Sequence, residues 1–221
     1  MSAGNPAAWH IGLIGYGEVG RILAEDLRAL GVRVSAYDVK LAGAAGDAMR
    51  SHAETHGVTL AASHAALAAQ ADLVVSAVTA SQAVPVAQAC APALRRGAYF
   101  LDLNSASPGA KIRAAGHVDS AGGRYVEGAV MTSVPPHRIR VPLLLGGPDA
   151  AALEPALATL GFAPKVHSEK LGVASATKMC RSVMIKGLEA MVIEGYTTAR
   201  AWGVEDAVLA SLKETFPGID W

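Results

Sequence analysis

A glycine-rich turn at residues 15–20 limits what this chain can fold into more than any other feature of its sequence. Gly15, Gly17 and Gly20 stand at the spacing G-x-G-x-x-G, directly after the apolar residues 11–14. The first glycine permits a tight turn, the second lets the backbone approach a pyrophosphate, and the third lets a helix pack closely on a sheet. Amides at the start of that helix bind phosphate groups. The pattern predicts a dinucleotide-binding turn, with cofactor contacts from Gly15, Tyr16, Gly17, Glu18, Val19 and Gly20.

The residues after the turn continue this pattern. Apolar side chains recur at helical spacing over 22–30, Gly31 follows, and residues 32–38 alternate as a strand that ends in Asp38. A carboxylate about twenty residues beyond the glycines accepts hydrogen bonds from an adenosine ribose, which favours NAD. Lys40 is close enough in sequence to reach the additional phosphate of NADP. We therefore expect NAD as the cofactor, with NADP as the alternative.

The composition excludes several other classes of protein. The chain has 221 residues and a formal net charge of zero, with 19 basic and 19 acidic side chains, so we expect no nucleic-acid partner. Its apolar runs are too short to span a membrane, and residues 1–6 lack the features of a signal peptide. Cys90 and Cys180 lack the spacing of metal ligands. The sequence predicts a cytoplasmic protein with neither a metal nor a membrane partner.

Strand and helix patterns alternate along the first 170 residues. Short apolar strands are expected at residues 58–61, 71–78, 99–103, 124–130, 141–147 and 162–167. Helical patterns lie between most of them, with Ser63, Ser107 and Asp149 as expected N-caps. This order predicts an α/β fold, a Rossmann-type doubly wound and mostly parallel sheet, as a dinucleotide-binding domain over residues 1–170.

A different pattern begins at residue 171. About 30 residues run without proline to Trp202, with apolar side chains at spacings of three and four, and such a helix spans roughly 45 Å. Glu205 begins a further helix, and the sequence stops at Trp221. We expect residues 171–221 to be a long interdomain helix and the beginning of a truncated, all-helical C-terminal domain.

Three further motifs accompany the glycine turn. Residues 102–108 read Asp-Leu-Asn-Ser-Ala-Ser-Pro, residues 125–133 read Tyr-Val-Glu-Gly-Ala-Val-Met-Thr-Ser, and residues 172–178 read Gly-Val-Ala-Ser-Ala-Thr-Lys. From residue 11 to about residue 202, the chain resembles the β-hydroxyacid dehydrogenases related to 6-phosphogluconate and 3-hydroxyisobutyrate dehydrogenase. Residues 214–221 are similar to a divergent branch with its own C-terminal domain.

The resemblance implies a role for residues in each motif. It implies that Lys178 is the catalytic residue. The implied cofactor contacts at two strand ends are Val78, Thr79 and Asn104. The implied substrate contacts are Asn104, Ser105, Met131, Thr132, Ser133, Arg181 and Ser182. The sequence departs from the family pattern at several of them: residues 131–133 replace a serine and two glycines, and residues 181–182 replace two asparagines.

The reaction implied is hydride transfer between nicotinamide and a small β-hydroxy acid, with or without decarboxylation. Lys178, partly desolvated beside other cations, would act as the base. His137, Arg138 and Arg140 follow the substrate loop, either as a cationic rim for a carboxylate or as solvated charges. The resemblance further implies a homodimer when the C-terminal domain is present. An imine reductase is one alternative, and a non-catalytic nucleotide-binding module is another if the natural chain ends at Trp221.

Overall fold

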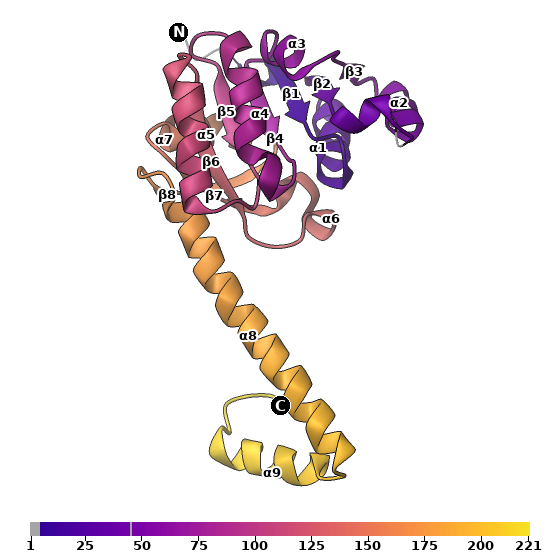
Figure 1. The fold of residues 1–221 in the computed structure, drawn as a ribbon, viewed down its shortest axis with the longest axis vertical. Coiled ribbons are helices and arrows are strands. Elements are labelled where there is room, and N and C mark those ends of the chain that lie inside the picture. Colours follow the sequence, from indigo (N-terminus) through magenta and orange to yellow (C-terminus); the bar gives the residue numbers. More distant parts are fainter. Residues whose placement is uncertain (1–4, 45) are drawn as a thin grey trace. The chain divides into compact units, whose positions relative to one another are not determined.

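The computed structural model describes residues 5–44 and 46–221. Residues 1–4, part of the N-terminal segment that lacks signal-peptide features, lie outside the described residues. The chain divides into two compact units, Met1–Lys178 and Met179–Trp221, and Figure 1 shows the elements of each. The division falls within the long helix, so that Lys178 belongs to the first unit.

An eight-stranded sheet forms the centre of the first unit (Figure 1). Its strands are β1 (His10–Ile14), β2 (Arg33–Tyr37), β3 (Thr59–Leu60), β4 (Leu73–Ser76), β5 (Tyr99–Asp102), β6 (Arg124–Val130), β7 (Pro142–Gly146) and β8 (Ala163–Ser168). In space they follow the order β3-β2-β1-β4-β5-β6-β7-β8. Pairing is parallel except between β6 and β7. The predicted Rossmann-type, mostly parallel sheet is confirmed.

Helices connect most of these strands. They are α1 (Glu18–Ala29), α2 (Gly46–Thr55), α3 (His64–Ala68), α4 (Ala83–Cys90), α5 (Pro108–Ser120), α6 (Val134–His137) and α7 (Ala150–Thr159). Short 3-10 turns lie at Pro6–Ala8, Val39–Ala42, Ala80–Gln82, Ala91–Ala93 and Arg138–Arg140. Ser63 and Ser107 cap α3 and α5 through their hydroxyl oxygens, as predicted.

Asp149 occupies the predicted N-cap position of α7, but its side chain does not cap the helix. Its carboxylate instead accepts a hydrogen bond of 2.7 Å from Arg124 Nε. The Asp149 carboxylate thus pairs with the Arg124 guanidinium of β6 through a charge-assisted hydrogen bond, and does not bind the amides at the start of α7.

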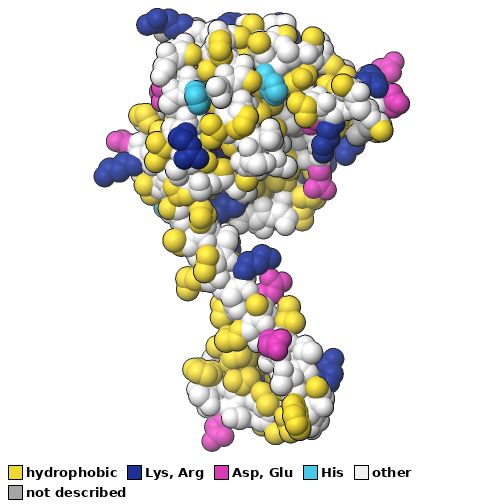
Figure 2. Space-filling model, viewed as in Figure 1, with side chains coloured by type: hydrophobic (Ala, Val, Ile, Leu, Met, Phe, Trp, Pro, Cys, Tyr) yellow, Lys and Arg dark blue, Asp and Glu magenta, His cyan; other side chains and the backbone are white. Residues whose placement is uncertain are grey.

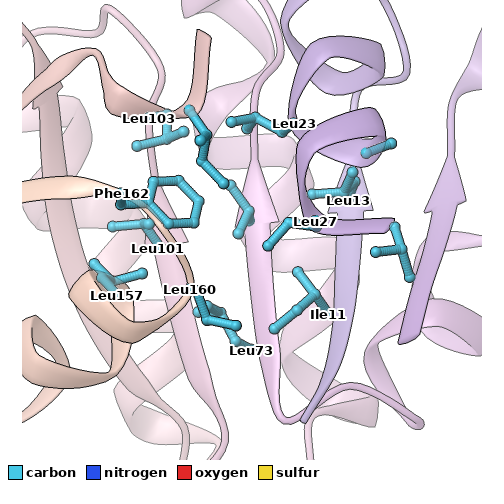
Figure 3. Packing of buried hydrophobic residues seen from close by; sticks show 14 of the residues in the cluster. Ile11, Leu13, Leu23, Leu27, Leu73, Leu101, Leu103, Leu157, Leu160 and Phe162 are labelled. Carbon is cyan, nitrogen blue, oxygen red and sulfur yellow. The ribbon is translucent and has the colours of Figure 1, made fainter. Parts of the chain in front are cut away.

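The sheet buries apolar side chains on both faces, as a mostly parallel sheet does. Leu73 and Val75 of β4 join one buried cluster together with residues of α1, α2 and α7, and Figure 3 shows part of this packing. Val74, between them, joins a second cluster with residues of α3, α4 and α5. Because successive side chains of a strand point to opposite faces, the two layers of helices cover opposite sides of the sheet.

The second unit is entirely helical in its regular structure. It contains the remainder of α8 (Val173–Ala201), which begins in the first unit, and α9 (Glu205–Thr215). Apolar side chains gather on its surface (Figure 2), and Val183, Met184 and Trp202 are each more than two-thirds exposed. This unit therefore buries few of its apolar side chains by itself. Among the described residues, no helix combines the length and the apolar character that crossing a bilayer requires.

Candidate functional site

The predicted site residues of the first unit gather at the carboxyl ends of its parallel strands. The sheet register aligns Ile14 with Ser76, Ser76 with Asp102, and Asp102 with Glu127 across β1, β4, β5 and β6. The glycine turn and Val78 follow the ends of β1 and β4. In open α/β sheets, ligands bind outside these ends, where the strand order reverses. Here the order reverses between β1 and β4, which places the candidate site beside the glycine turn.

The backbone at the glycine turn has the geometry that its spacing predicts. Gly15 has a φ of +90°, a value that favours glycine. A Cβ placed on Gly17 would have no neighbour within 4 Å, so the backbone is open on that side. A Cβ placed on Gly20 would collide with the carbonyl oxygen of Gly15. The turn is tight, open at its middle glycine and closely packed at its third, as a dinucleotide site requires.

Asp38 links the end of β2 to this turn. Its carboxylate accepts hydrogen bonds from Tyr16 N at 2.8 Å and from Lys40 N at 2.9 Å. Each oxygen keeps a second lone pair for a further donor. The carboxylate is thus held beside the glycine turn, while its contact with a ribose stays a prediction.

Asn104 is buried and bridges the ends of β4 and β5. Its Oδ1 accepts a hydrogen bond of 2.6 Å from Val78 N, and its Nδ2 donates to Ser76 Oγ at 3.0 Å. Asn104 N in turn donates to Asp102 Oδ1 at 2.8 Å. These bonds fix the loops that carry Val78 and Ser105. The predicted contacts of Asn104, Val78 and the exposed Thr79 with cofactor or substrate stay predictions.

Lys178 reaches the end of β5 from the second turn of α8. Its Nζ donates a hydrogen bond of 2.7 Å to Ser105 Oγ. The side chain is half-buried, and burial lowers the pKa of Lys178 below its ordinary value, with a smaller contribution from the positive charge of Lys111. The structure therefore brings together two predicted site residues that lie 73 positions apart.

A buried lysine that the sequence analysis did not single out lies behind this contact. Lys111 is 1% exposed, and its Nζ donates to Asp102 Oδ1 at 2.9 Å. Burial lowers the pKa of Lys111, and the neighbouring Asp102 carboxylate opposes that shift. The sequence does contain a signal, because Lys111 shares one face of α5 with Ala114, Ala115 and Val118, all of them buried.

A buried carboxylate ties β6 to the start of α8. Glu127 is fully buried and accepts hydrogen bonds from Gly172 N at 2.7 Å, from Ser175 N at 2.6 Å and from the Ser175 hydroxyl. The amides at a helix start have no partner within the helix and favour a negative charge. Glu127 thus anchors the first turn of the helix that carries Lys178.

The remaining predicted substrate residues follow β6 or belong to α8. Met131 follows β6 at the same edge of the sheet, and Thr132 and Ser133 are exposed. Arg181 and Ser182 are exposed residues of α8 in the second unit. The substrate contacts predicted for these five residues stay predictions.

Arg138 does not form part of a cationic rim. Its Nη2 donates to Glu25 Oε2 at 2.7 Å, and its Nε donates to Asp26 Oδ1 at 2.8 Å. Ile139 N adds a bond of 3.0 Å to Asp26 Oδ2. These contacts fasten the segment after β6 to α1, so the guanidinium is neutralised by two carboxylates.

Three side chains with metal-ligating atoms lie between α1 and α2. Among the described residues, they are the one cluster of three or more such side chains. Glu25, His52 and His56 offer atoms within 4.8 Å of one another. His52 Nε2 lies 2.9 Å from Glu25 Oε1, and His52 Nδ1 lies 2.8 Å from the hydroxyl of Tyr16. Since both ring nitrogens of His52 and both oxygens of Glu25 are engaged, we assign this cluster to the packing of α1 on α2.

An open, doubly wound sheet with a glycine turn at its switch point defines a Rossmann-type dinucleotide-binding domain. A family model described as the NAD binding domain of 6-phosphogluconate dehydrogenase matches residues 10–163. The match covers more than half of the chain and includes the glycine turn, Asp38 and Asn104. The chain therefore belongs to this family of NAD-binding domains, and the resemblance drawn from its motifs is confirmed.

Solved structures agree with this assignment. A conserved hypothetical protein from Sinorhizobium meliloti is 41% identical, with a TM-score of 0.83 over 96% of this chain and 71% of that one. A conserved protein of unknown function, described as structurally similar to 3-hydroxyacid dehydrogenases, is 31% identical, with a TM-score of 0.78 over 95% of this chain and 77% of that one.

More distant relatives include named enzymes. Mitochondrial 3-hydroxyisobutyrate dehydrogenase from Drosophila melanogaster is 23% identical over 97% of this chain and 65% of its own length. An imine reductase from Myxococcus stipitatus shares the fold at 22% identity, with a TM-score of 0.79 over 95% of this chain and 72% of that one, in a variant complex with NAD+. A complex of the imine reductase from the same organism with NADP+ also matches. A nicotinamide cofactor is thus supported for the family, without a choice between the two forms.

Proposed function

We propose that the chain carries the cofactor-binding domain and the catalytic lysine of an NAD(P)-dependent dehydrogenase acting on the CH–OH group of a small β-hydroxy acid. One observation carries the proposal: Lys178 Nζ meets Ser105 Oγ at 2.7 Å, at the carboxyl edge of the sheet beside the glycine turn. This is the edge at which ligands bind in doubly wound folds. The family membership supports the cofactor, and the mitochondrial relative supports the class of substrate.

The residues at the glycine turn fit a dinucleotide. The open side of Gly17 leaves room for a pyrophosphate, and the free amides at the start of α1 would hold it. Asp38 would hold the adenosine ribose, and Val78, Thr79 and Asn104 would flank the nicotinamide. When bound, the nicotinamide supplies the chemistry of hydride acceptance and donation.

Lys178 would handle the proton of the reaction. Oxidation of a hydroxyl requires a base, and the lowered pKa of Lys178 leaves more of its amine neutral at a given pH. Ser105 Oγ orients the amine by accepting a hydrogen bond from it. In the reverse direction the ammonium would return the proton to the carbonyl oxygen. If the product is a β-keto acid, the same ammonium would polarise its carbonyl during decarboxylation, which release of CO2 would report.

We propose that a substrate carboxylate contacts residues at three predicted segments. These residues are Ser105, Met131, Thr132, Ser133, Arg181 and Ser182. Asn104 would orient the nearest of them, because its amide already fixes the loop that carries Ser105. A panel of hydroxy acids that differ in chain length and in the presence of the carboxylate would define the class.

Asp38 supports NAD over NADP. Its carboxylate suits a free ribose 2′-hydroxyl and repels a 2′-phosphate. Lys40, whose side chain is exposed two residues later, supports NADP as the alternative. Titration calorimetry with both cofactors decides between them.

The test of the proposed function is Lys178→Met. Methionine keeps the length and apolar contacts of the side chain and removes the amine. We expect turnover to fall by about 100-fold or more, as for loss of a general base, while cofactor affinity stays within about threefold. Lys165→Met, at an exposed lysine of β8, is the matched control. Unchanged turnover in Lys178→Met would overturn the assignment.

An imine reductase is the second candidate, because the loop at Met131–Ser133 and the helix at Arg181 depart from the family's carboxylate-binding pattern. Such an enzyme would reduce C=N bonds with the same domain and need no carboxylate anchor. Activity on cyclic imines without activity on hydroxy acids would select it. NAD(P)H binding without turnover of either class would instead select a non-catalytic nucleotide-binding module.

We also propose the setting in which the chain works. Residues 1–170 form the cofactor domain, and residues 171–221 belong to a helical domain that would mediate a homodimer in the cytoplasm. The helical content of the second unit, Met179–Trp221, supports a helical C-terminal domain. Light scattering of the purified protein measures the oligomeric state, and fractionation of cells locates it.

A further inference from the structure

The described part of the first unit buries an ammonium and two carboxylates behind the candidate site. Lys111 is 1% exposed, and Asp102 and Glu127 are both 0% exposed. Charged groups are seldom buried to this degree unless they are paired and hydrogen-bonded. The proposed hydride transfer uses none of the three, so their burial calls for a separate explanation.

Lys111 connects α5 to the end of β5 and to β6. Its Nζ donates to Asp102 O at 2.7 Å, to Asp102 Oδ1 at 2.9 Å and to Gly128 O at 3.3 Å. Three acceptors match the three N–H groups of an ammonium. Tyr125 donates to the other oxygen, Asp102 Oδ2, at 2.7 Å. The end of β5, which Ser105 follows, is thereby fixed against β6.

Glu127 fixes the second partner of the contact. It accepts hydrogen bonds from the amides of Gly172 and Ser175, at the first turn of α8. Lys178 follows Ser175 by three residues, about one turn along the helix. Gly146, opposite Glu127 on β7, leaves the space for this carboxylate, because a Cβ there would come within 2.7 Å of Glu127 Oε2.

We propose that Lys111 and Glu127 are positioning residues that hold Lys178 against Ser105 for the proposed reaction. Lys111 fixes the strand end before Ser105, and Glu127 fixes the helical turn before Lys178. The inference rests on the proposed function of Lys178 and assigns a role to two buried charges that this function leaves unused. Neither residue touches substrate in this account, and each acts through the position of the amine.

The charge of Lys111 gives this role a second effect. Its ammonium, on α5, lowers the pKa of Lys178 in addition to the larger effect of burial. Asp102 and Glu127 face Lys111 from β5 and β6, and His167 of β8 contacts the residue that precedes Lys178. Removing the Lys111 charge should therefore raise the pKa of Lys178, an effect that the loss of packing alone does not predict.

The test is Lys111→Met, with Tyr125→Phe and Lys165→Met as controls. Lys111→Met should lower kcat by about 100-fold, as a small misplacement of a reacting group does, with cofactor affinity within about threefold. Its profile of kcat/KM against pH should rise at higher pH than that of the wild type. Tyr125→Phe removes one bond to Asp102 and keeps the Lys111 charge, so its profile should rise at the wild-type pH. A wild-type kcat and profile in Lys111→Met would overturn the proposal.

A second readout does not depend on activity. The rate at which an amine reagent labels Lys178 in the folded protein, followed by mass spectrometry across pH, reports its neutral fraction directly. Lys111→Met should shift this labelling curve to higher pH, and an unshifted curve would overturn the proposal. If the wild type turns over no hydroxy acid but the shift is found, the proposed function fails while the positioning of Lys178 stands.

Glu127 provides an independent variant if Lys111→Met does not fold. Glu127→Gln keeps the shape of the side chain and removes the charge that binds the start of α8. It should lower kcat by about 100-fold, and Glu127→Asp, which keeps the charge, should retain more activity than Glu127→Gln. Equal, wild-type activity in both variants would overturn the role assigned to Glu127.

Discussion

Substitution of two glycines of the turn, Gly17 and Gly20, should affect different properties of the protein. Gly17 precedes α1 with φ of −78° and ψ of −152°, an extended conformation that other residues adopt. A Cβ there would have no neighbour within 4 Å. Gly20 lies inside α1, and a Cβ there would collide with the carbonyl oxygen of Gly15. The first glycine should therefore matter for binding and the second for folding.

The magnitudes follow from these surroundings. Serine is a favoured N-cap, so Gly17→Ser should change the free energy of unfolding by no more than about 0.5 kcal/mol. At Gly20 the obstructing atom is backbone and cannot rotate away, so overpacking costs about 3 kcal/mol. Alanine recovers about 1 kcal/mol of helix propensity over glycine. Gly20→Ala should thus lose about 2 kcal/mol, or roughly 4–8 °C in Tm.

Thermal unfolding and titration calorimetry with NADH measure both effects. Gly17→Ser should unfold within about 2 °C of the wild type and bind NADH at least about tenfold more weakly, which is about 1.4 kcal/mol. The reasoning is refuted if Gly17→Ser binds NADH as tightly as the wild type, because the pyrophosphate of the cofactor would then not lie close to this glycine. It is also refuted if Gly20→Ala is as stable as the wild type.

Two further predictions concern charges near the turn. Asp38→Asn removes the charge that repels a 2′-phosphate, so the affinity for NADP relative to NAD should rise about tenfold in calorimetry; an unchanged ratio contradicts the assignment of Asp38. Hydrogen bonds from His52 and then Arg138 hold the pKa of Glu25 below its ordinary value. The stabilisation from Glu25 is therefore present above its unfolded pKa of about 4.3 and is lost as the pH falls through the folded pKa. The free energy of unfolding of Glu25→Gln, measured with urea at several acidic pH values, should fall less steeply with falling pH than that of the wild type. The same pH dependence in both proteins would count against this pairing.

The dinucleotide-binding part of the fold was predictable because its determinants are local in the sequence. The positive φ of Gly15 belongs to the turn itself, and the atoms that a Cβ on Gly20 would meet belong to Gly15 and Tyr16. The caps at Ser63 and Ser107 depend on amides three residues away. Such patterns carry their own geometry, whatever the rest of the chain does.

Contacts between distant segments were not predictable in the same way. Arg138 pairs with Glu25 across 113 positions and with Asp26 across 112 positions, and no local pattern distinguishes this from a solvated charge. Asp149 is the N-cap residue of α7, but its carboxylate pairs with Arg124, 25 positions away, and not with the amides of the helix. Each side chain had several possible partners, and the packing of the sheet with its helices selected one.

Lys111 shows how a general expectation can hide a site residue. A lysine on a helix ordinarily faces water, because burying an ammonium costs far more than burying an alkyl chain. Here the acceptors that offset this cost come from Asp102 and Gly128, on β5 and β6. Only the parallel register of these two strands brings the acceptors together, and the sequence alone does not supply that register.

Transfer of deuterium from substrate to cofactor tests the central claim most directly. A β-hydroxy acid that carries deuterium on its hydroxyl-bearing carbon is incubated with the protein and the oxidised cofactor. The mass of the reduced cofactor is then measured by mass spectrometry. We predict that the wild type transfers the deuterium to the nicotinamide. In Lys178→Met the rate of this transfer should fall by about 100-fold or more. Unlabelled or unreduced cofactor with every hydroxy acid of the panel, in a protein that binds the cofactor, would contradict the claim.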